Sequence, residues 1–276
     1  MQLADSINMS MPSIITQTHK AGDGRIFQIT INRPEVYNCI NGDAAALLLD
    51  AWKTFRDDDS LTVALLHGAG DMSFCSGADL KSLNELVNIN ANKEEEKKFI
   101  ESGTGPMGGT RIVQTKPVIT VSQGYTYAGG LELFCHGHIR LAEEQATFSV
   151  ACRRWGVPLA DGGTVYLPRL LGLGTALPLI ITGQKITAQR AFAIGLVWEV
   201  IQQGNGLDRA FEYARQICEQ PRDALMADLA SAINGYHLPI EDALRLEAGG
   251  IYEVVRSESI KKGVQKFLSG ERSWFQ

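Results

Sequence analysis

The chain has 276 residues, of which 45% are hydrophobic and 21% are charged, and its net charge is −5. This composition is typical of a soluble globular protein, and the acidic balance argues against a nucleic-acid binder or a protein attracted to an anionic membrane surface. The five cysteines are scattered and odd in number, which favours reduced thiols over a disulfide framework. Because no signal-peptide pattern precedes residue 12 and no apolar run could span a bilayer, we expect a cytoplasmic protein.

The first half of the chain repeats one pattern of strand, loop and helix. Alternating apolar residues predict a strand over 26–31, and a run of Ala and Leu predicts a helix over 44–55. The Lys- and Glu-rich residues 88–98 predict a solvated helix or a mobile loop. On either side of that stretch the pattern recurs, as strand 63–67, loop 68–77 and helix 78–86, and as strand 118–121, loop 124–130 and helix 131–136.

The second half is predicted to continue this pattern and then to end in helices. We expect a strand pair at 139–142 and 146–148, a loop to residue 163, helices through residue 195 and a last strand over 197–201. Residues 207–267 have strong helical character with one apolar face, which should pack on the core or on a neighbouring subunit. Strand–loop–helix units followed by a helical tail predict an α/β fold.

Two short segments, residues 74–80 and 125–133, carry most of the functional information. Each places small residues where a strand passes into a helix, so that free backbone N–H groups could converge on one anionic oxygen. The second segment also places Glu132 inside an apolar run, where burial raises the pKa of a carboxyl group. Taken singly, each junction is typical of helix capping, and Glu132 of a surface acid. Their repetition beside a carboxylate favours an enzyme that stabilises an enolate.

Other residues with chemical potential have simpler interpretations. Cys135, His136 and His138 cannot converge on a metal ion from one regular element, so we interpret them as packing residues. Cys152 has no assignable base and is interpreted as a small hydrophobe lining a pocket rather than a nucleophile. Asp161 is either a helix N-cap or a second catalytic acid. No glycine signature for nucleotide binding is complete.

In combination, five groups of residues make the chain resemble the enoyl-CoA hydratase/isomerase (crotonase) superfamily from about residue 13 onward. These groups are 32–34 with Asn38, 74–80, 128–133, 162–164 with 167–169, and 179–183 with 191–197. The resemblance implies the ClpP/crotonase-like spiral of β-β-α units over residues 12–205 and a helical trimerisation region over 206–276. It also implies a homotrimer or homohexamer that acts on an acyl-CoA thioester, with no cofactor or metal ion.

The resemblance assigns roles to individual residues. The backbone N–H groups of Ala78 and Gly129 would hold the thioester oxygen, and Glu132 matches one of the two catalytic glutamates of hydratases. A basic residue often found at position 36 or 37 is absent, so Lys81, or Lys261 and Lys262 of a neighbouring subunit, would contact the phosphates. The residues expected to bind coenzyme A and the acyl group are Val36, Tyr37, Cys39, Ser76, Gly77, Asp79, Leu80, Lys81, Gly130, Cys152 and Trp155.

The sequence departs from the hydratases at Cys152, where they carry their second catalytic glutamate. A neutral thiol cannot take this general acid/base role, and losing such a group typically lowers a rate by about 10²–10⁴. Two routes remain: Glu132 acts alone, which suffices for isomerisation of a double bond, or Asp161 supplies the second carboxyl group. The three residues that follow Cys152 either line the acyl pocket or form a salt-bridged surface turn.

We therefore expect an acyl-CoA enzyme of the enoyl-CoA hydratase or isomerase type that stabilises a thioester enolate. One alternative is another reaction on the same scaffold, namely thioester hydrolysis, decarboxylation or dehalogenation. A second alternative is a non-catalytic protein that binds acyl-CoA. A ClpP-like peptidase is disfavoured because no Ser/His/Asp triad can be assigned.

Overall fold

The centre of the structure, a computed structural model that describes residues 11–270, is a six-stranded sheet in the order β1-β2-β3-β5-β7-β10. β1 and β2 form an antiparallel hairpin, and every later neighbour in this sheet is parallel. The hairpin turns at Gly22, whose φ of 55° suits a glycine. Its first strand was not anticipated from the sequence. The strands are β1 (Ile14–Ala21), β2 (Gly24–Ile31), β3 (Val63–Gly68), β5 (Val118–Ser122), β7 (Ile139–Glu143) and β10 (Glu199–Ile201).

A second, four-stranded sheet corrects three of the sequence expectations. Its strands are β4 (Ser73–Cys75), β6 (Tyr125–Tyr127), β8 (Thr147–Ser149) and β9 (Ile186–Thr187). Both β4 and β6 lie inside stretches predicted as loops, because three residues are too few to show a strand period. The expected pair at 139–142 and 146–148 does not form: β7 pairs with β5 and β10, whereas β8 pairs with β6 and β9.

The two sheets are built from one repeated unit. β3, β5 and β7 each lie in the larger sheet, and each is followed by a short strand of the smaller sheet, β4, β6 or β8. A helical segment then follows in every case: the 3-10 helix η2 (Leu80–Ser82) with α2 (Leu83–Leu86), the helix α4 (Gly129–Phe134), and the 3-10 helix η3 (Ala151–Trp155). The expected spiral of β-β-α units is confirmed, and it brings three strand-to-helix junctions to one region.

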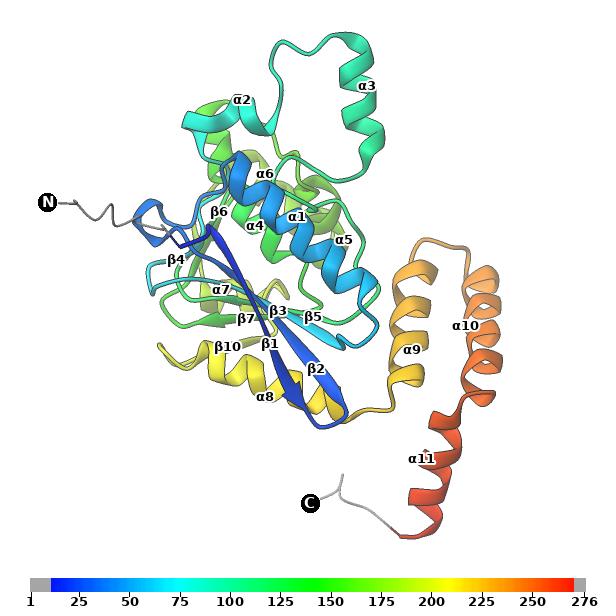
Figure 1. Cartoon of the computed structure of the whole chain (residues 1–276). Helices are drawn as coiled ribbons and strands as arrows, with labels where there is room; N and C mark the ends of the chain where they lie inside the picture. The colour runs from blue at the N-terminus through cyan, green and yellow to red at the C-terminus, as the bar shows by residue number, and fades with distance from the viewer. Residues whose placement is uncertain (1–10, 271–276) are drawn as a thin grey trace, which may run out of the picture.

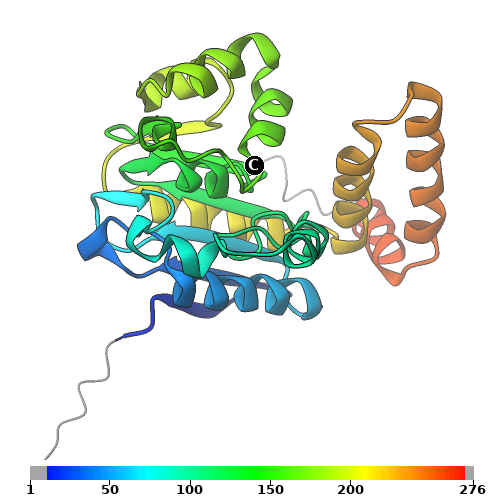
Figure 2. The ribbon, with the colours of Figure 1, turned by 90° about the horizontal axis from the view of Figure 1, so that it is seen from above.

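Helices cover both faces of the larger sheet (Figures 1 and 2). α1 (Gly42–Asp57) begins at Asn41, whose side chain accepts from the Ala44 N–H, and it buries Trp52 and Phe55 in the larger of two apolar clusters. α8 (Gly206–Glu219) covers the opposite face with Ala210 and Ala214. These clusters account for the bulk of the buried apolar surface, which drives folding.

The remaining helices of the spiral connect its strands. α3 (Lys93–Ser102) begins with a capping box between Asn92 and Glu95. Part of the Lys- and Glu-rich stretch is therefore a solvated helix, which was one of the two structures expected for it. The 3-10 helix η1 (Pro34–Val36) follows β2. α5 (Gly163–Leu171), α6 (Leu173–Thr182) and α7 (Ala188–Ala193) occupy the region where helices were expected.

The last three described helices, α9 (Arg222–Gly235), α10 (Ile240–Val255) and α11 (Glu258–Leu268), extend away from the sheets (Figures 1 and 2). Within the predicted carboxyl-terminal region, α8 thus packs on the sheet, while the other three pack mainly on one another. Large apolar side chains remain exposed on them, including Ile251 at 56% and Tyr252 at 64%. None of the helices in the described part of the chain has the length and apolar character needed to cross a membrane.

Candidate active site

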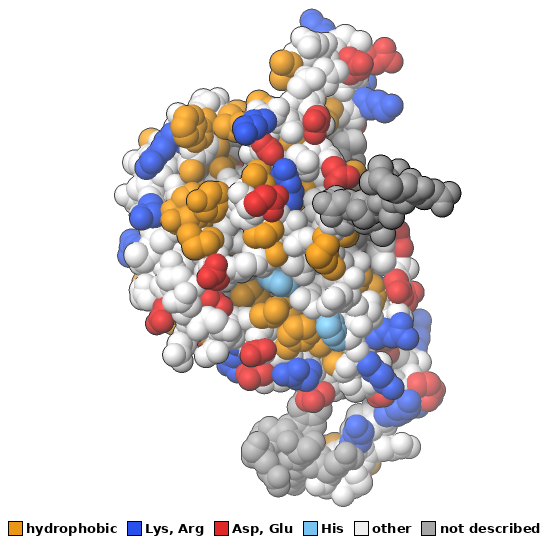
Figure 3. Space-filling model, turned by 60° about the vertical axis from the view of Figure 1, so that its left-hand side comes forward, with side chains coloured by type: hydrophobic (Ala, Val, Ile, Leu, Met, Phe, Trp, Pro, Cys, Tyr) orange, Lys and Arg blue, Asp and Glu red, His pale blue; other side chains and the backbone are white. Residues whose placement is uncertain are grey.

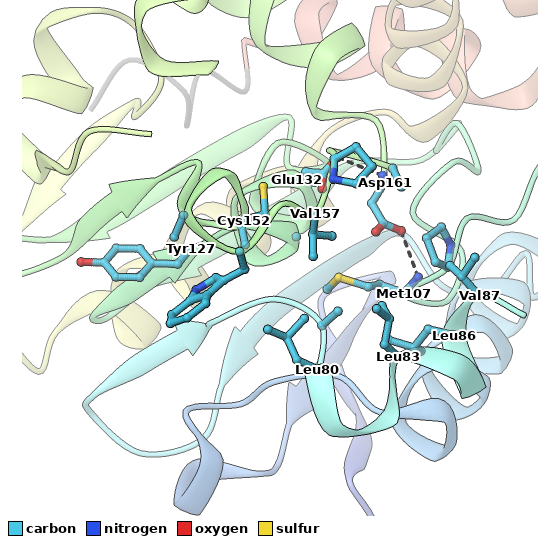
Figure 4. A pocket seen from close by; sticks show the side chains of 18 of the residues that line it. Leu80, Leu83, Leu86, Val87, Met107, Tyr127, Glu132, Cys152, Val157 and Asp161 are labelled. Carbon is cyan, nitrogen blue, oxygen red and sulfur yellow. Dashed lines mark hydrogen bonds between the residues drawn. The ribbon is translucent and has the colours of Figure 1, made fainter. Parts of the chain in front are cut away.

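A cavity of about 280 Å³ opens where the strand-to-helix junctions meet. Its walls come from η2 and α2, from the loop before β5, from the start of α4, and from η3 with the loop that follows it. Figure 4 shows Glu132 and Cys152 on one side of this cavity, with Leu80 and Leu83 on the other. The size is near the lower end of the range of small-molecule sites.

The cavity collects eight of the predicted site residues. They are Ser76, Ala78, Leu80, Gly129, Glu132, Cys152, Trp155 and Asp161. Seven others do not line it: Val36, Tyr37, Cys39, Gly77, Asp79, Lys81 and Gly130. The catalytic candidates are therefore together, whereas most of the residues expected to hold coenzyme A lie outside the enclosed part of the site.

Two backbone N–H groups, of Ala78 and Gly129, are left without a partner at the cavity. The sequence placed Ala78 at the start of a helix, but it forms a parallel bridge to Ile40 instead, and η2 begins two residues later. That bridge uses the Gly77 carbonyl and the Asp79 N–H, so the Ala78 N–H stays free. Gly129 is the first residue of α4, where an N–H has no acceptor within the helix. Across residues 11–270, neither group donates a hydrogen bond to another residue.

The backbone geometry at the two junctions requires small residues. A Cβ atom on Gly77, where φ is 100°, would lie 3.0 Å from the Gly129 nitrogen, so the two junctions are in close contact. Ala128, just before α4, has a φ of 51° and a ψ of −125°, a conformation that costs a non-glycine residue free energy. A strained backbone conformation of this kind persists where the surrounding structure fixes it. At Ala128 it sets the direction of the Gly129 N–H group.

Glu132 has the electrostatics of a proton-transfer group. Its side chain is 2% exposed, and its Oε1 accepts from the Asp161 N–H at 2.9 Å and the Gly163 N–H at 2.7 Å. No hydrogen bond to Oε2 forms among the described residues, and the Glu132 side chain lines the cavity. Burial, reinforced by the negative charge of Asp161, raises the pKa of the carboxyl group to about 7. Glu132 is therefore not a surface acid.

Asp161 is a second buried carboxyl group in the same cavity. Its Oδ1 accepts from the Met107 N–H at 2.9 Å (Figure 4), and it also accepts from the hydroxyl of Thr110. Burial raises the pKa of this carboxyl group. The N-cap of α5 is Gly162, and among residues 11–270 no side chain caps that helix, so the capping interpretation of Asp161 is wrong. Two carboxyl groups, from α4 and from the loop before α5, thus share one apolar cavity.

Cys152 lies on η3 within the same cavity and is 7% exposed. Burial, together with the nearby Glu132, raises the pKa of its thiol, so the neutral form dominates near pH 7. A neutral thiol is a poor nucleophile and cannot serve as a carboxylate. Trp155 lines the cavity from the end of the same 3-10 helix with 71% of its surface exposed, whereas Arg153 and Arg154 are exposed outside it.

Several predicted binding residues have structural contacts in this structure. The Asp79 carboxylate pairs with Arg33 at 3.3 Å, and the same guanidinium donates to the Cys39 carbonyl oxygen at 2.7 Å. A Cβ atom on Gly130 would lie 2.0 Å from the Cys75 carbonyl oxygen, so this glycine is required for α4 to pack on β4.

The three residues weighed as metal ligands have separate surroundings. His136 contacts the Thr110 carbonyl oxygen through Nε2, and His138 accepts from the Val118 N–H at 3.0 Å. Burial lowers the pKa of each imidazole to about 4, so both are neutral. Cys135 is buried in the larger apolar cluster. His136 therefore holds the loop that carries Thr110, one of the partners of Asp161.

Sequence reasoning missed the apolar wall of the cavity. Its members are Leu83, Leu86, Val87, Pro106, Met107, Val157 and Pro158. Nothing in their pattern separates them from ordinary core residues, because a cavity wall and a core are equally apolar. The wall excludes water and strengthens electrostatic interactions inside the cavity. Two convergent N–H groups, two protonatable carboxyl groups and a dry wall suit proton transfer at a carbon atom next to a polarised carbonyl group.

Comparison with known proteins identifies the family of the chain. A family model described as enoyl-CoA hydratase/isomerase matches residues 21–276. The chain is 30% identical over 246 residues to a short-chain-enoyl-CoA hydratase of Clostridium acetobutylicum, covering 89% of this chain and 92% of that protein. It is 30% identical over 245 residues to an (E)-benzylidenesuccinyl-CoA hydratase of Thauera aromatica, with coverages of 88% and 92%. The crystal structure of an enoyl-CoA hydratase from Mycobacterium tuberculosis superposes with a TM-score of 0.82 at 28% identity, covering 94% of this chain and 96% of that one.

Proposed function

This chain belongs to the enoyl-CoA hydratase/isomerase family, and from that premise we propose that it transfers protons on the acyl group of a coenzyme A thioester. The observation that supports this most directly is the content of the cavity. Two unpaired N–H groups, of Ala78 and Gly129, and a buried acid, Glu132, with a pKa of about 7 face the same space. A general acid/base works best when its pKa lies near the working pH.

In the proposed reaction the thioester carbonyl oxygen accepts hydrogen bonds from the Ala78 and Gly129 N–H groups. Negative charge that develops on this oxygen as an enolate forms is stabilised there, and removal of one such donor typically costs about 10²–10³ in rate. Because the donors are backbone groups fixed by the junctions, they need no rearrangement when the charge appears.

The carboxyl groups supply and accept the protons. For isomerisation, ionised Glu132 removes a proton from one carbon of the acyl chain and returns it to another, which restores the enzyme. For hydration, the ionised member of the carboxyl pair accepts a proton from a water molecule as its oxygen bonds to the β-carbon, and the protonated member donates a proton to the α-carbon. A proton that then passes between the two carboxyl groups restores the enzyme. The raised pKa of each buried carboxyl group suits this division, because two coupled carboxyl groups titrate as a pair.

The acyl group proposed for this site is uncharged and mostly apolar. The wall opposite the carboxyl groups is formed by Leu80, Leu83, Leu86 and Val87. A charged acyl group would lose its hydration there without a partner. The two relatives named above are equally similar to this chain in sequence, but their names specify different acyl groups. The cavity wall is therefore the better guide to the substrate.

A panel of acyl- and enoyl-CoA esters in heavy water would test this function. We expect at least one ester to exchange an α- or γ-proton, and Glu132→Gln to slow the exchange by about 10²–10⁴. Glu144→Gln is the matched control, because Glu144 is an exposed carboxylate outside the cavity. The proposal fails if no ester exchanges, or if Glu132→Gln exchanges as fast as the control.

Of the two reactions, isomerisation is the one that needs a single carboxyl group, and one observation favours it: a thiol, that of Cys152, lies beside Glu132. A shuttle between two carbons needs one carboxyl group, whereas hydration of the double bond uses two. We expect Cys152→Glu to increase hydration of crotonyl-CoA if the site lacks only that group, with Cys152→Gln as the uncharged control. No gain would indicate that Asp161 already fills the role or that the reaction is not hydration.

We also propose that the chain assembles as a homotrimer or a pair of trimers. The support is the apolar surface left on α9–α11, and further apolar groups lie between charged side chains on the face shown in Figure 3. Lys261 and Lys262 lie on α11, which Figure 1 shows well apart from α2 and α4, the helices that contribute to the cavity, so they would reach a phosphate only across an interface. Lys81, beside the cavity on η2, is the phosphate contact proposed within the subunit.

A further inference from the structure

Arg111 lies behind the two carboxyl groups and was not singled out by any sequence pattern. It belongs to the loop between α3 and β5, is half-buried, and does not line the cavity. Its Nε and Nη2 donate to the Ala160 carbonyl oxygen at 3.0 and 2.7 Å. Its guanidinium also lies 5.7 Å from the centre of the Phe99 ring on α3, which helps to hold its position.

The peptide group between Ala160 and Asp161 connects Arg111 to Glu132. Its carbonyl oxygen accepts from Arg111, and its N–H donates to Oε1 of Glu132 at 2.9 Å. The two ends of a trans peptide point in opposite directions, so the three groups form a chain from guanidinium through peptide to carboxylate. Hydrogen bonds in such a chain polarise one another, and a cation at the carbonyl end strengthens the N–H as a donor.

We propose that Arg111 is a positioning residue for the carboxyl pair. By fixing and polarising the Ala160–Asp161 peptide group, it directs the N–H onto Glu132 and holds Oε2 of that carboxylate toward the cavity. The inference rests on the proposed function for its catalytic meaning, but the chain of hydrogen bonds that it concerns exists without a substrate.

The other titratable groups near the pair do not supply a positive charge. Glu132 is faced by Asp161, by Cys152 from η3 and by Cys135, the C-cap of α4. Asp161 is faced by Thr110 and by Cys75 from β4. Burial raises the pKa of all three thiols, so they are neutral. Arg111 is the cation whose charge opposes the rise in the pKa of Asp161.

Titration of Glu132 by infrared spectroscopy of the unliganded protein tests the inference. The band of the protonated carboxyl group is assigned by its loss in Glu132→Gln. Because two coupled carboxyl groups titrate as a pair, the comparison is made in an Asp161→Asn background, where Glu132 titrates alone. We expect Arg111→Gln in that background to raise the midpoint of the Glu132 titration by about one pH unit. This shift is smaller than the one expected from the loss of a direct hydrogen bond to a charged group, because Arg111 acts through the peptide group.

Two further variants complete the design. Arg111→Lys keeps the charge but loses the two-pronged contact with Ala160, so we expect about half the shift, and it provides a result if Arg111→Gln does not fold. Arg190→Gln removes an exposed cation on α7 and is the matched control, with no expected shift. A midpoint in the folded Arg111 variants equal to that of the control would overturn the inference.

The outcome is independent of whether any ester reacts. A shifted midpoint in a protein that exchanges no ester would overturn the proposed function and leave the positioning role intact. If an ester does react, we expect both limbs of the bell-shaped pH profile of the wild-type background to move to higher pH in Arg111→Gln. A purely structural role would lower the maximum of the profile without moving its limbs.

Discussion

Replacing Glu132 by Gln should make the protein more stable at high pH while it removes the proton-transfer group. The amide oxygen of Gln can still accept from the Asp161 and Gly163 N–H groups, so the backbone contacts are kept. The negative charge that burial disfavours is lost. The expected gain in stability depends on pH and follows from the raised pKa of the wild-type carboxyl group.

The size of this effect comes from the rise in the pKa of Glu132 from 4.5 to about 7. Below the lower value both the folded and the unfolded chain hold the proton, and Glu132 carries no penalty. As the pH rises between the two values, the unfolded chain releases the proton and the folded chain does not, so stability falls. Above the upper value the loss is complete, at about 3 kcal/mol. Between about pH 5 and about pH 8 the expected change is about 2.5 kcal/mol.

Urea unfolding of the wild type and of Glu132→Gln at both pH values measures this quantity. The difference in the free energy of unfolding between the variant and the wild type should grow by about 2.5 kcal/mol from about pH 5 to about pH 8. All measurements use one fixed protein concentration, because association adds to apparent stability. Glu144→Gln, on the surface, controls for the loss of a carboxylate elsewhere. A gain that does not change with pH would refute the burial argument for Glu132 and with it the raised pKa.

Three further predictions follow from other parts of the structure. Gly130→Ala should lower stability by about 1–3 kcal/mol in thermal unfolding, because its Cβ would lie 2.0 Å from the Cys75 carbonyl oxygen. Gly174→Ala is the control and should not destabilise the protein, because a Cβ atom there would lie in open space. Asp161→Asn should slow hydration by about 10²–10⁴ and move the acidic limb of the pH profile to lower pH, since this carboxylate raises the pKa of its neighbour; an unmoved limb would contradict the coupling. Ile251→Glu on α10 should shift the oligomer toward smaller species in analytical ultracentrifugation, and an unchanged sedimentation profile would place the subunit interface elsewhere.

The sequence anticipated the parts of this molecule that depend on local chemistry. Small residues at the junctions and an acid inside an apolar run indicated the N–H groups and the burial of Glu132, because each depends on its immediate neighbours. Asp161 shows the limit of this reasoning. Its neighbours suggested a helix cap, but its partners Met107 and Thr110 lie far away in the sequence, and no local pattern reports such contacts.

The same limit explains the missed strands and the missed arginine. β4 and β6 have three residues each, too few for an alternating pattern, and they are strands because the sheet beside them offers partners. Arg111 follows a glycine-rich loop and looks like any surface cation in the sequence. Its role depends on the Ala160 carbonyl oxygen, which only the folded chain brings within reach.

The arrangement of the helices and the larger sheet also has consequences for the order of folding. Neighbouring parallel strands such as β3 and β5 are separated by long stretches of chain, so each pairing must wait for a large loop to close. α9 and α10 are adjacent in the chain and contact each other directly, and helical hairpins form orders of magnitude faster than such sheets. We therefore expect the apolar helices to be in place while the sheet is still incomplete. During refolding at high concentration, these helices would then be the first surface through which chains associate, correctly or not.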